Sequence, residues 1–151
     1  AIEDAMTGYR LPVSFAIDPE PDQGPMAGIR TAMRGVERDT AAAYGFVAAC
    51  DMPFVDPGVV ELLFERAQGH DAAVPRPDEW YETTHAVYRA TAMADACDAA
   101  LARGERRILA PLDDLDWVVV EAAALREHGS LDTFRNVNTR EEFERAARDL
   151  A

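Results

Sequence analysis

Residues 44–54 read YGFVAACDMPF, a nearly continuous apolar run that ends in a single carboxylate, Asp51, followed by Met52 and Pro53. An apolar run of this length is typical of a strand in a parallel sheet that helices cover on both faces. The pair Asp56-Pro57 then supplies a helix cap and a first helical turn, so a helix is predicted through about Ala67. The order of strand, turn and helix at this point predicts an α/β fold.

The same alternation continues on both sides of this stretch. Apolar periodicity predicts helices over residues 1–9, 25–39, 92–103, 108–115 and from Thr139 to the C-terminus, and strands over 13–17, 72–75, 85–89 and 117–121. The last helix starts with a capping box of Thr139 and Glu142, and its apolar face carries Phe143 and Leu150. We therefore predict one domain over residues 1–151, a three-layer α/β/α Rossmann-like domain with a mostly parallel sheet.

Composition and charge exclude several classes of partner. All 15 basic residues are arginine, and the 28 acidic residues bring the net charge of the 151-residue chain to −13. Nucleic acid phosphates repel such a surface, so DNA and RNA are excluded as partners. No apolar run approaches the ~20 residues that cross a bilayer, and no leader sequence is recognised, so we expect a cytoplasmic protein. The large negative charge favours a salt-adapted surface. A weak homo-oligomer is left open. Cys50 and Cys97 have neither zinc nor redox spacing, and both are expected to be reduced and buried.

The segment after the first predicted strand is a candidate nucleotide site. Ligands of open α/β sheets bind beyond the carboxyl ends of the strands. Asp18 occupies such a position, and Gly24 and Gly28 belong to a Gly/Pro turn, QGPMAG, that opens a helix. The glycines let a ligand approach the backbone, and the start of the helix offers unpaired N–H groups. An ordinary strand-to-helix turn would use the same residues.

Asp51 and two asparagines are candidates for a metal and phosphate site. A carboxylate after a buried strand is either a turn former or a metal ligand, and Mg²⁺ prefers one or two carboxylates together with substrate phosphates and water. Asn136 and Asn138 stand at i and i+2 in an extended segment, so their side chains are expected to point the same way, towards a hydroxyl, a phosphate or the water shell of a metal. Loop and cap chemistry is the alternative use of both asparagines.

Four short motifs together resemble a known family. They are QGPMAG at 23–28, CDMPF at 50–54, HAVYR at 85–89 and NVNT at 136–139. In this order they resemble the motifs of molybdenum cofactor guanylyltransferase. That family belongs to the nucleotidyltransferases with a GT-A-like fold, the fold of the nucleotide-diphospho-sugar transferases. The likeness runs from about residue 10 to the C-terminus. Cytidylyltransferases and other guanylyltransferases of cofactor synthesis share the fold and the aspartate motif, but the first and last motifs favour the molybdenum branch.

The resemblance implies transfer of GMP from GTP to the terminal phosphate of molybdopterin (the molybdenum cofactor), with release of pyrophosphate. It implies Mg²⁺ as the cofactor, with Asp51 as its ligand, and Asn136 and Asn138 on the metal and acceptor side. It also implies a nucleotide pocket formed by Asp18, Gly24, Gly28 and Asp51, with Asp18 as the contact for guanine or ribose.

One part of the family pattern has no counterpart in the chain. The family opens with a strand, a glycine-rich loop with basic residues that cradles the triphosphate, and a helix. Because that strand is central in the family's sheet, we expect its absence to expose apolar strand edges and to leave the chain as it stands inactive or nearly so. Two alternatives stay open: a related cytidylyl- or cobinamide-phosphate guanylyltransferase, and a catalytically silent module that binds nucleotide or molybdopterin.

Overall fold

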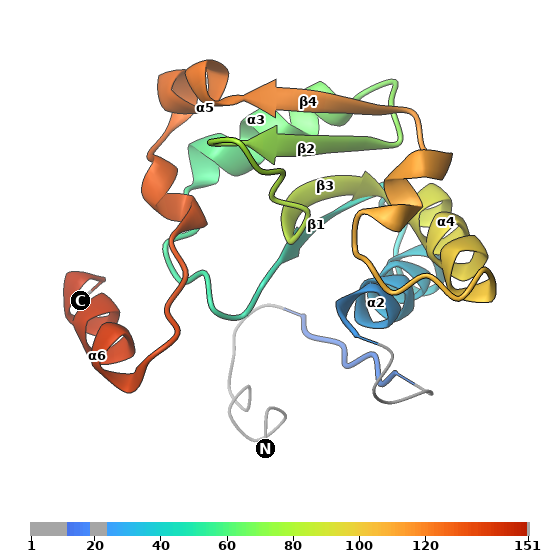
Figure 1. Ribbon diagram of the computed structural model, residues 1–151, viewed down its shortest axis with the longest axis horizontal. Helices are drawn as coiled ribbons and strands as arrows, with labels where there is room; N and C mark the ends of the chain where they lie inside the picture. The colour runs from blue at the N-terminus through green and yellow to red at the C-terminus, as the bar shows by residue number, and fades with distance from the viewer. Residues whose placement is uncertain (1–11, 19–23, 151) are drawn as a thin grey trace.

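The computed structural model describes residues 12–18 and 24–150 (Figure 1). Its helices are α2 (Pro25–Asp39), α3 (Pro57–Ala67), α4 (Ala90–Ala102), α5 (Ala122–His128) and α6 (Arg140–Asp149), with the 3-10 turns η1 (Ala110–Asp114) and η2 (Leu131–Phe134). Its strands are β1 (Tyr44–Ala48), β2 (Ala72–Arg76), β3 (His85–Arg89) and β4 (Trp117–Glu121). The predicted helix over 1–9 lies outside the described residues.

The four strands form one sheet in the order β1-β3-β2-β4. β2 and β4 are parallel, whereas β3 is antiparallel to both of its neighbours, so three strands point one way and β3 points the other. The mostly parallel sheet predicted from the sequence is thus a mixed one. The cause is the short connection from Arg76 to His85, because a parallel strand needs a crossover of about a dozen residues or more.

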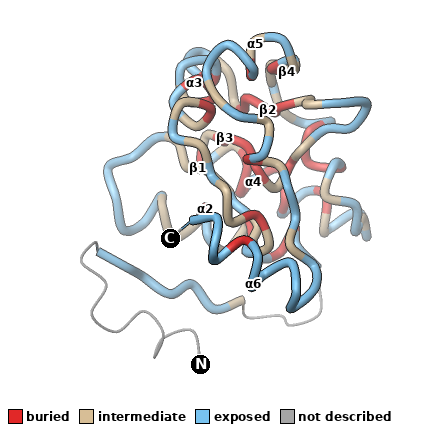
Figure 2. The backbone as a smooth tube through the Cα atoms, turned by 90° about the vertical axis from the view of Figure 1, so that its left-hand side faces the viewer, coloured by how far each residue is buried: buried red, intermediate tan, exposed pale blue. Residues whose placement is uncertain are grey.

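Helices cover both faces of this sheet, which confirms the three-layer arrangement. Alternate residues of each strand point to opposite faces, so Ala86 and Tyr88 of β3 pack against α2 and α4, while Val87 packs with α3 and α5. Buried residues accordingly concentrate in β2, β3 and the inner sides of the helices (Figure 2). Cys97 is buried in this core as expected, but Cys50 is exposed at the end of β1.

Three predicted elements differ in the structure. Residues 12–18 are not a strand, and the apolar side chain of Ile17 is 80% exposed. The helix predicted over 108–115 is reduced to the turn η1, because Pro111 cannot donate the hydrogen bond that would continue a helix. The capping box of α6 is confirmed, but its predicted apolar face is buried only at Ala146. Phe143 is 63% and Leu150 59% exposed, and α6 stands apart from the sheet in Figure 1.

None of the helices in the described part of the chain is long and apolar enough to span a bilayer.

Candidate functional site

A cavity of about 670 Å³ lies between α2, β1 and the segment that follows β1. Its long wall is apolar, with Ile29, Met33 and Val36 from α2 facing Gly45 and Val47 of β1. Its other end is polar, and the side chains there belong to Asp51, Glu82, Thr84 and Asn136. A cavity with an apolar wall and a few polar groups at one end is the usual form of a small-molecule site.

Backbone hydrogen bonds hold the polar end together. The N–H of Val137 donates to the carbonyl of Asp51 (2.8 Å), which fastens the segment before α6 to the turn after β1. The N–H of Ala49 donates to the carbonyl of Thr84 (2.9 Å), which fastens the same turn to the segment before β3. Three segments that are far apart in the sequence therefore meet at one end of the cavity.

A cation-π contact strengthens the first of these junctions. The guanidinium carbon of Arg135 lies 3.9 Å from the centre of the Phe54 ring. This contact joins the segment before α6, which contains Arg135, to the segment after β1, which contains Phe54. Asn136, the next residue, is thereby held at the mouth of the cavity with Asp51.

Glu82 is a residue of the polar end that the sequence analysis missed. Its N–H donates to the carbonyl of Pro75 (2.9 Å), and its carbonyl accepts from the N–H of His85 (3.2 Å). Burial raises the pKa of its carboxyl, and the charges of Asp78 and Asp51 raise it further. The only signal in the sequence is a carboxylate near the end of a polar loop, three residues before a predicted strand.

The structure brings together three of the predicted site residues: Gly28, Asp51 and Asn136 all line this cavity. Gly24 does not line it, but it caps α2 with a φ of +79°, and Pro25, the next residue, lines the cavity.

Two other predicted residues lie apart from the cavity. Asp18 is not among the residues that line it, and its carboxylate lies 3.6 Å from the guanidinium of Arg30. Asn138 lines a separate cavity at the start of α6, where its N–H donates to the Glu142 carboxylate (2.9 Å). Glu142 also accepts from the N–H of Thr139, and these bonds lower its pKa. The cap of α6 thus engages the backbone of Asn138, whereas Asn136 stays at the cavity.

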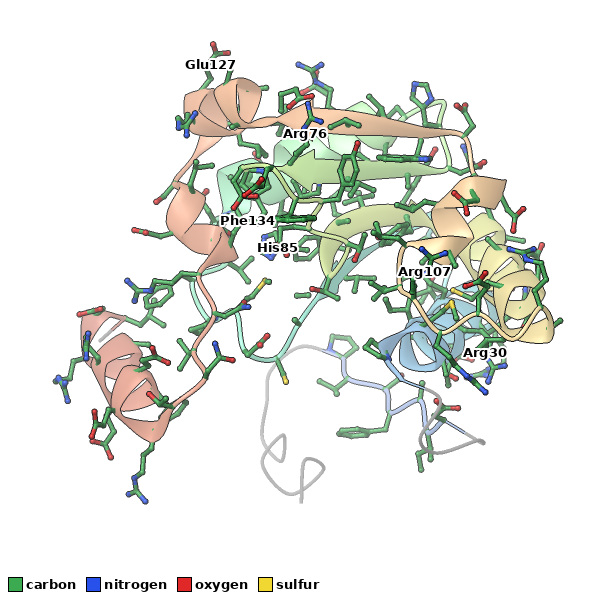
Figure 3. All side chains as sticks on the ribbon, in the orientation of Figure 1. Arg30, Arg76, His85, Arg107, Glu127 and Phe134 are labelled. Atoms are coloured by element: carbon green, nitrogen blue, oxygen red, sulfur yellow. The ribbon has the colours of Figure 1, made fainter. Side chains whose placement is uncertain are left out.

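His85, in one of the four motifs, is a core residue rather than a cavity residue. Its ring is fully buried between Phe46 and Phe134, with ring centres 4.9 Å apart in each pair, and Figure 3 shows it beside Phe134. Its Nε2 lies 2.9 Å from the hydroxyl of Thr133. Burial lowers the pKa of His85 to about 4, so the imidazole is neutral at neutral pH.

The donor set at the polar end fits a magnesium ion. The part of the chain that the structure describes contains no group of three or more His, Cys, Asp or Glu side chains that could hold a metal by themselves. Mg²⁺ does not need such a group, because it takes one or two carboxylates and completes its six ligands with water and phosphate oxygens. Asp51, Glu82 and Asn136 offer hard oxygen ligands of this kind. A zinc site would need several histidine or cysteine ligands, and of the residues that line the cavity only Cys50 is of these types.

Comparison with known proteins relates the chain to one family of nucleotidyltransferases. Residues 2–116 match the family described as MobA-like NTP transferase domain. The chain is 52% identical over 141 residues to a probable molybdenum cofactor guanylyltransferase of Natronomonas pharaonis, covering 93% of this chain and 68% of that protein. It is 42% identical over 135 residues to a protein of the same name from Methanosarcina mazei, covering 87% of this chain and 58% of that protein.

Solved structures show the same relationship. The molybdopterin-guanine dinucleotide biosynthesis protein A of Archaeoglobus fulgidus superimposes with a TM-score of 0.76 at 32% identity, over 99% of this chain and 73% of that one. A protein of Aquifex aeolicus shares the fold, with a TM-score of 0.64 at 23% identity, over 83% of this chain and 62% of that one. The chain thus spans between 58% and 68% of the length of the two curated relatives.

Proposed function

Because the chain belongs to the family of MobA-like NTP transferase domains, we propose that it transfers GMP from GTP to the terminal phosphate of molybdopterin and releases pyrophosphate. The observation that carries the proposal is the cavity that joins an apolar wall to a polar end with Asp51 and Asn136. A nucleotide has the matching form, with an aromatic base at one end and phosphates at the other.

In the proposed reaction an oxygen of the molybdopterin phosphate attacks the α-phosphorus of GTP. The new P–O bond forms as the bond to pyrophosphate breaks, in line on the opposite side of the phosphorus. The protein has little covalent work to do, so catalysis consists of positioning and of stabilising charge on the phosphate oxygens. A bound Mg²⁺ supplies most of that charge stabilisation.

Each predicted residue has a distinct part in this reaction. Asp51 holds the magnesium ion at the end of β1, and the amide of Asn136 orients phosphate oxygens or a water of the metal. Asn138, which lines the separate cavity at the start of α6, is proposed to contact the acceptor. Gly24 and Gly28 shape the wall next to the nucleotide, since the start of α2 borders the cavity there.

Asp18 is the proposed contact for guanine. A carboxylate can accept two N–H bonds from the edge of this base, which is a charge-assisted pair with good geometry. Arg30, whose side chain is 18% exposed, lies 3.6 Å from this carboxylate and is also 3.5 Å from Asp98. For Asp18 to serve guanine, its carboxylate must turn from Arg30 towards the cavity, and Asp98 would keep Arg30 paired.

Titration with nucleotides tests the proposal. We expect GTP to bind in a Mg²⁺-dependent manner and in preference to CTP, and chelation of the metal with EDTA to abolish binding of the triphosphate. With molybdopterin present, we expect a chain that carries the family's glycine-rich N-terminal segment to form the guanine dinucleotide and pyrophosphate. Preference for CTP would instead indicate a cytidylyltransferase, and metal-dependent binding of GTP without turnover would indicate a silent binding module.

Substituting Gly28 tests whether the nucleotide occupies this cavity. A Cβ added at Gly28 meets no atom within 4 Å, and one added at Gly35, on the same helix, comes no closer than 3.9 Å to Ala16. Gly28→Ala and Gly35→Ala should therefore both stabilise α2, each by about 0.5–1 kcal/mol.

Only Gly28→Ala places a methyl group in the large cavity, because Gly35 does not line it. We expect this variant to weaken GTP binding by about 3–10-fold, measured by calorimetric titration, with Gly35→Ala unchanged. Equal affinities of the two variants for GTP would place the nucleotide elsewhere.

A further inference from the structure

We infer that Glu82 is a second carboxylate ligand of the magnesium ion that Asp51 holds, so that the metal is clamped between the end of β1 and the loop before β3. The inference rests on the proposed function, and it concerns a residue that none of the four sequence motifs contains. It is carried by the position of Glu82 at the polar end of the cavity, by the charge of its surroundings and by the absence, among the described residues, of a hydrogen-bond or ion-pair partner for its carboxylate.

The backbone fixes where the Glu82 side chain starts. Its N–H is bonded to Pro75 at the end of β2, and its carbonyl receives the N–H of His85 at the start of β3. The carbonyl of Thr84, two residues after Glu82, accepts the N–H of Ala49, the residue directly after β1. Because β1 and β3 are paired from Ala48 and His85 onward, the ends that carry Asp51 and Glu82 are adjacent. A ligand fixed in this way loses little conformational freedom when it binds a metal.

The two other acidic residues of the loop before β3, Asp78 and Glu79, are not placed to bind a metal in the cavity. Asp78 accepts the N–H of Trp80 (2.8 Å) and so serves as a turn cap. Glu79 is exposed, and it does not line the cavity. By contrast, no hydrogen bond or ion pair engages the carboxylate of Glu82 or of Asp51 among the described residues. Glu82 is therefore the one carboxylate of this loop that is both half-buried and directed to the cavity.

The charge at this end of the cavity favours a cation. Two carboxylates stand there, and none of the residues that line the cavity is an arginine or a histidine. Half-buried carboxylates that lie close together repel each other, and their repulsion rises as water is displaced by a ligand. A divalent cation between them removes this repulsion, and it still has positions left for water and for phosphate oxygens of GTP.

Binding of Mn²⁺, which replaces Mg²⁺ and is followed by its electron paramagnetic resonance signal, tests the inference apart from turnover. The titration is made on the wild-type chain and on Glu82→Gln, Asp51→Asn and Glu79→Gln, each with and without GTP. The Glu82 carboxylate makes no hydrogen bond or ion pair within residues 12–18 and 24–150, so Glu82→Gln should fold normally, which circular dichroism checks. We expect Glu82→Gln to weaken Mn²⁺ binding at least about tenfold, and Glu79→Gln, with the same change of charge in the same loop, to bind as the wild type.

The pattern across the variants separates the inference from the proposed function. If Asp51→Asn loses Mn²⁺ and Glu82→Gln keeps the wild-type affinity, the inference is wrong and the function stands. If neither variant changes Mn²⁺ binding, or the wild type binds none, both the inference and the metal site of the proposed function are wrong. Equal weakening by Glu82→Gln and Glu79→Gln would show an effect of net charge alone, which also contradicts the inference.

Discussion

Asp51→Asn should abolish GMP transfer, with a fall in kcat/KM of about 10³-fold or more, in a chain that carries the family's glycine-rich N-terminal segment. That fall corresponds to about 4 kcal/mol of transition-state stabilisation, which is within the range that a lost metal contact removes. The variant keeps the shape of the side chain, and the backbone carbonyl of Asp51 still accepts the N–H of Val137. The loss should therefore come from the missing charge and not from an altered fold.

Asp113→Asn is the matched control for this experiment. Asp113 is exposed on η1 and does not line the cavity, so the same change of charge there should leave transfer unchanged. The measurement is the initial rate of dinucleotide formation at several Mg²⁺ concentrations. Transfer by Asp51→Asn at the wild-type rate and with the wild-type requirement for Mg²⁺ would rule out Asp51 as the metal ligand.

Gly58→Ala should have the largest effect on stability, with a loss of about 3 kcal/mol in the free energy of unfolding. A Cβ at Gly58 would overlap the carbonyl oxygen of His128, at the end of α5. That neighbour is backbone, so it can move only if α3 and α5 separate. The substitution is expected to disturb the site as well, because Asp56 of the same turn accepts the N–H of Ser130 (2.9 Å).

Urea denaturation followed by circular dichroism measures this loss. Gly69→Ala is the comparison, since Gly69 has a φ of +85° but a Cβ there would meet no atom within 4 Å. Strain alone should cost about 1 kcal/mol, so the difference between the two variants isolates the clash. Equal losses would mean that the contact between α3 and α5 yields easily.

The turn at Asp56 shows how the core supports the candidate site. Hydrogen bonds from Ser130 and from the start of α3 lower the pKa of Asp56, so the carboxylate is charged and holds both elements. The N–H of Asp56 also donates to the hydroxyl of Thr133 (3.0 Å), which in turn lies against His85. The chain from Ser130 to Thr133 is thus fixed to the core directly before it reaches Asn136.

The sequence by itself determined the features that depend on near neighbours in the chain. The caps at Asp56 and Thr139, the apolar strand that ends near Asp51 and the start of α2 at Pro25 are all present where the pattern predicts them. Each of these depends on hydrogen bonds and periodicities that span about four residues, and such signals are written in the sequence itself. The order of the four motifs likewise indicated the family that the comparisons show.

Only the tertiary structure decided which polar groups meet. The pairing of β1 with β3 brings Glu82 to the end of β1, although Glu82 belongs to no recognisable pattern. The cap of α6 separates Asn138 from Asn136, and the ion pair with Arg30 holds Asp18 beside α2. These outcomes depend on strand order and on contacts between residues tens of positions apart, and no local periodicity records which distant segments will become neighbours.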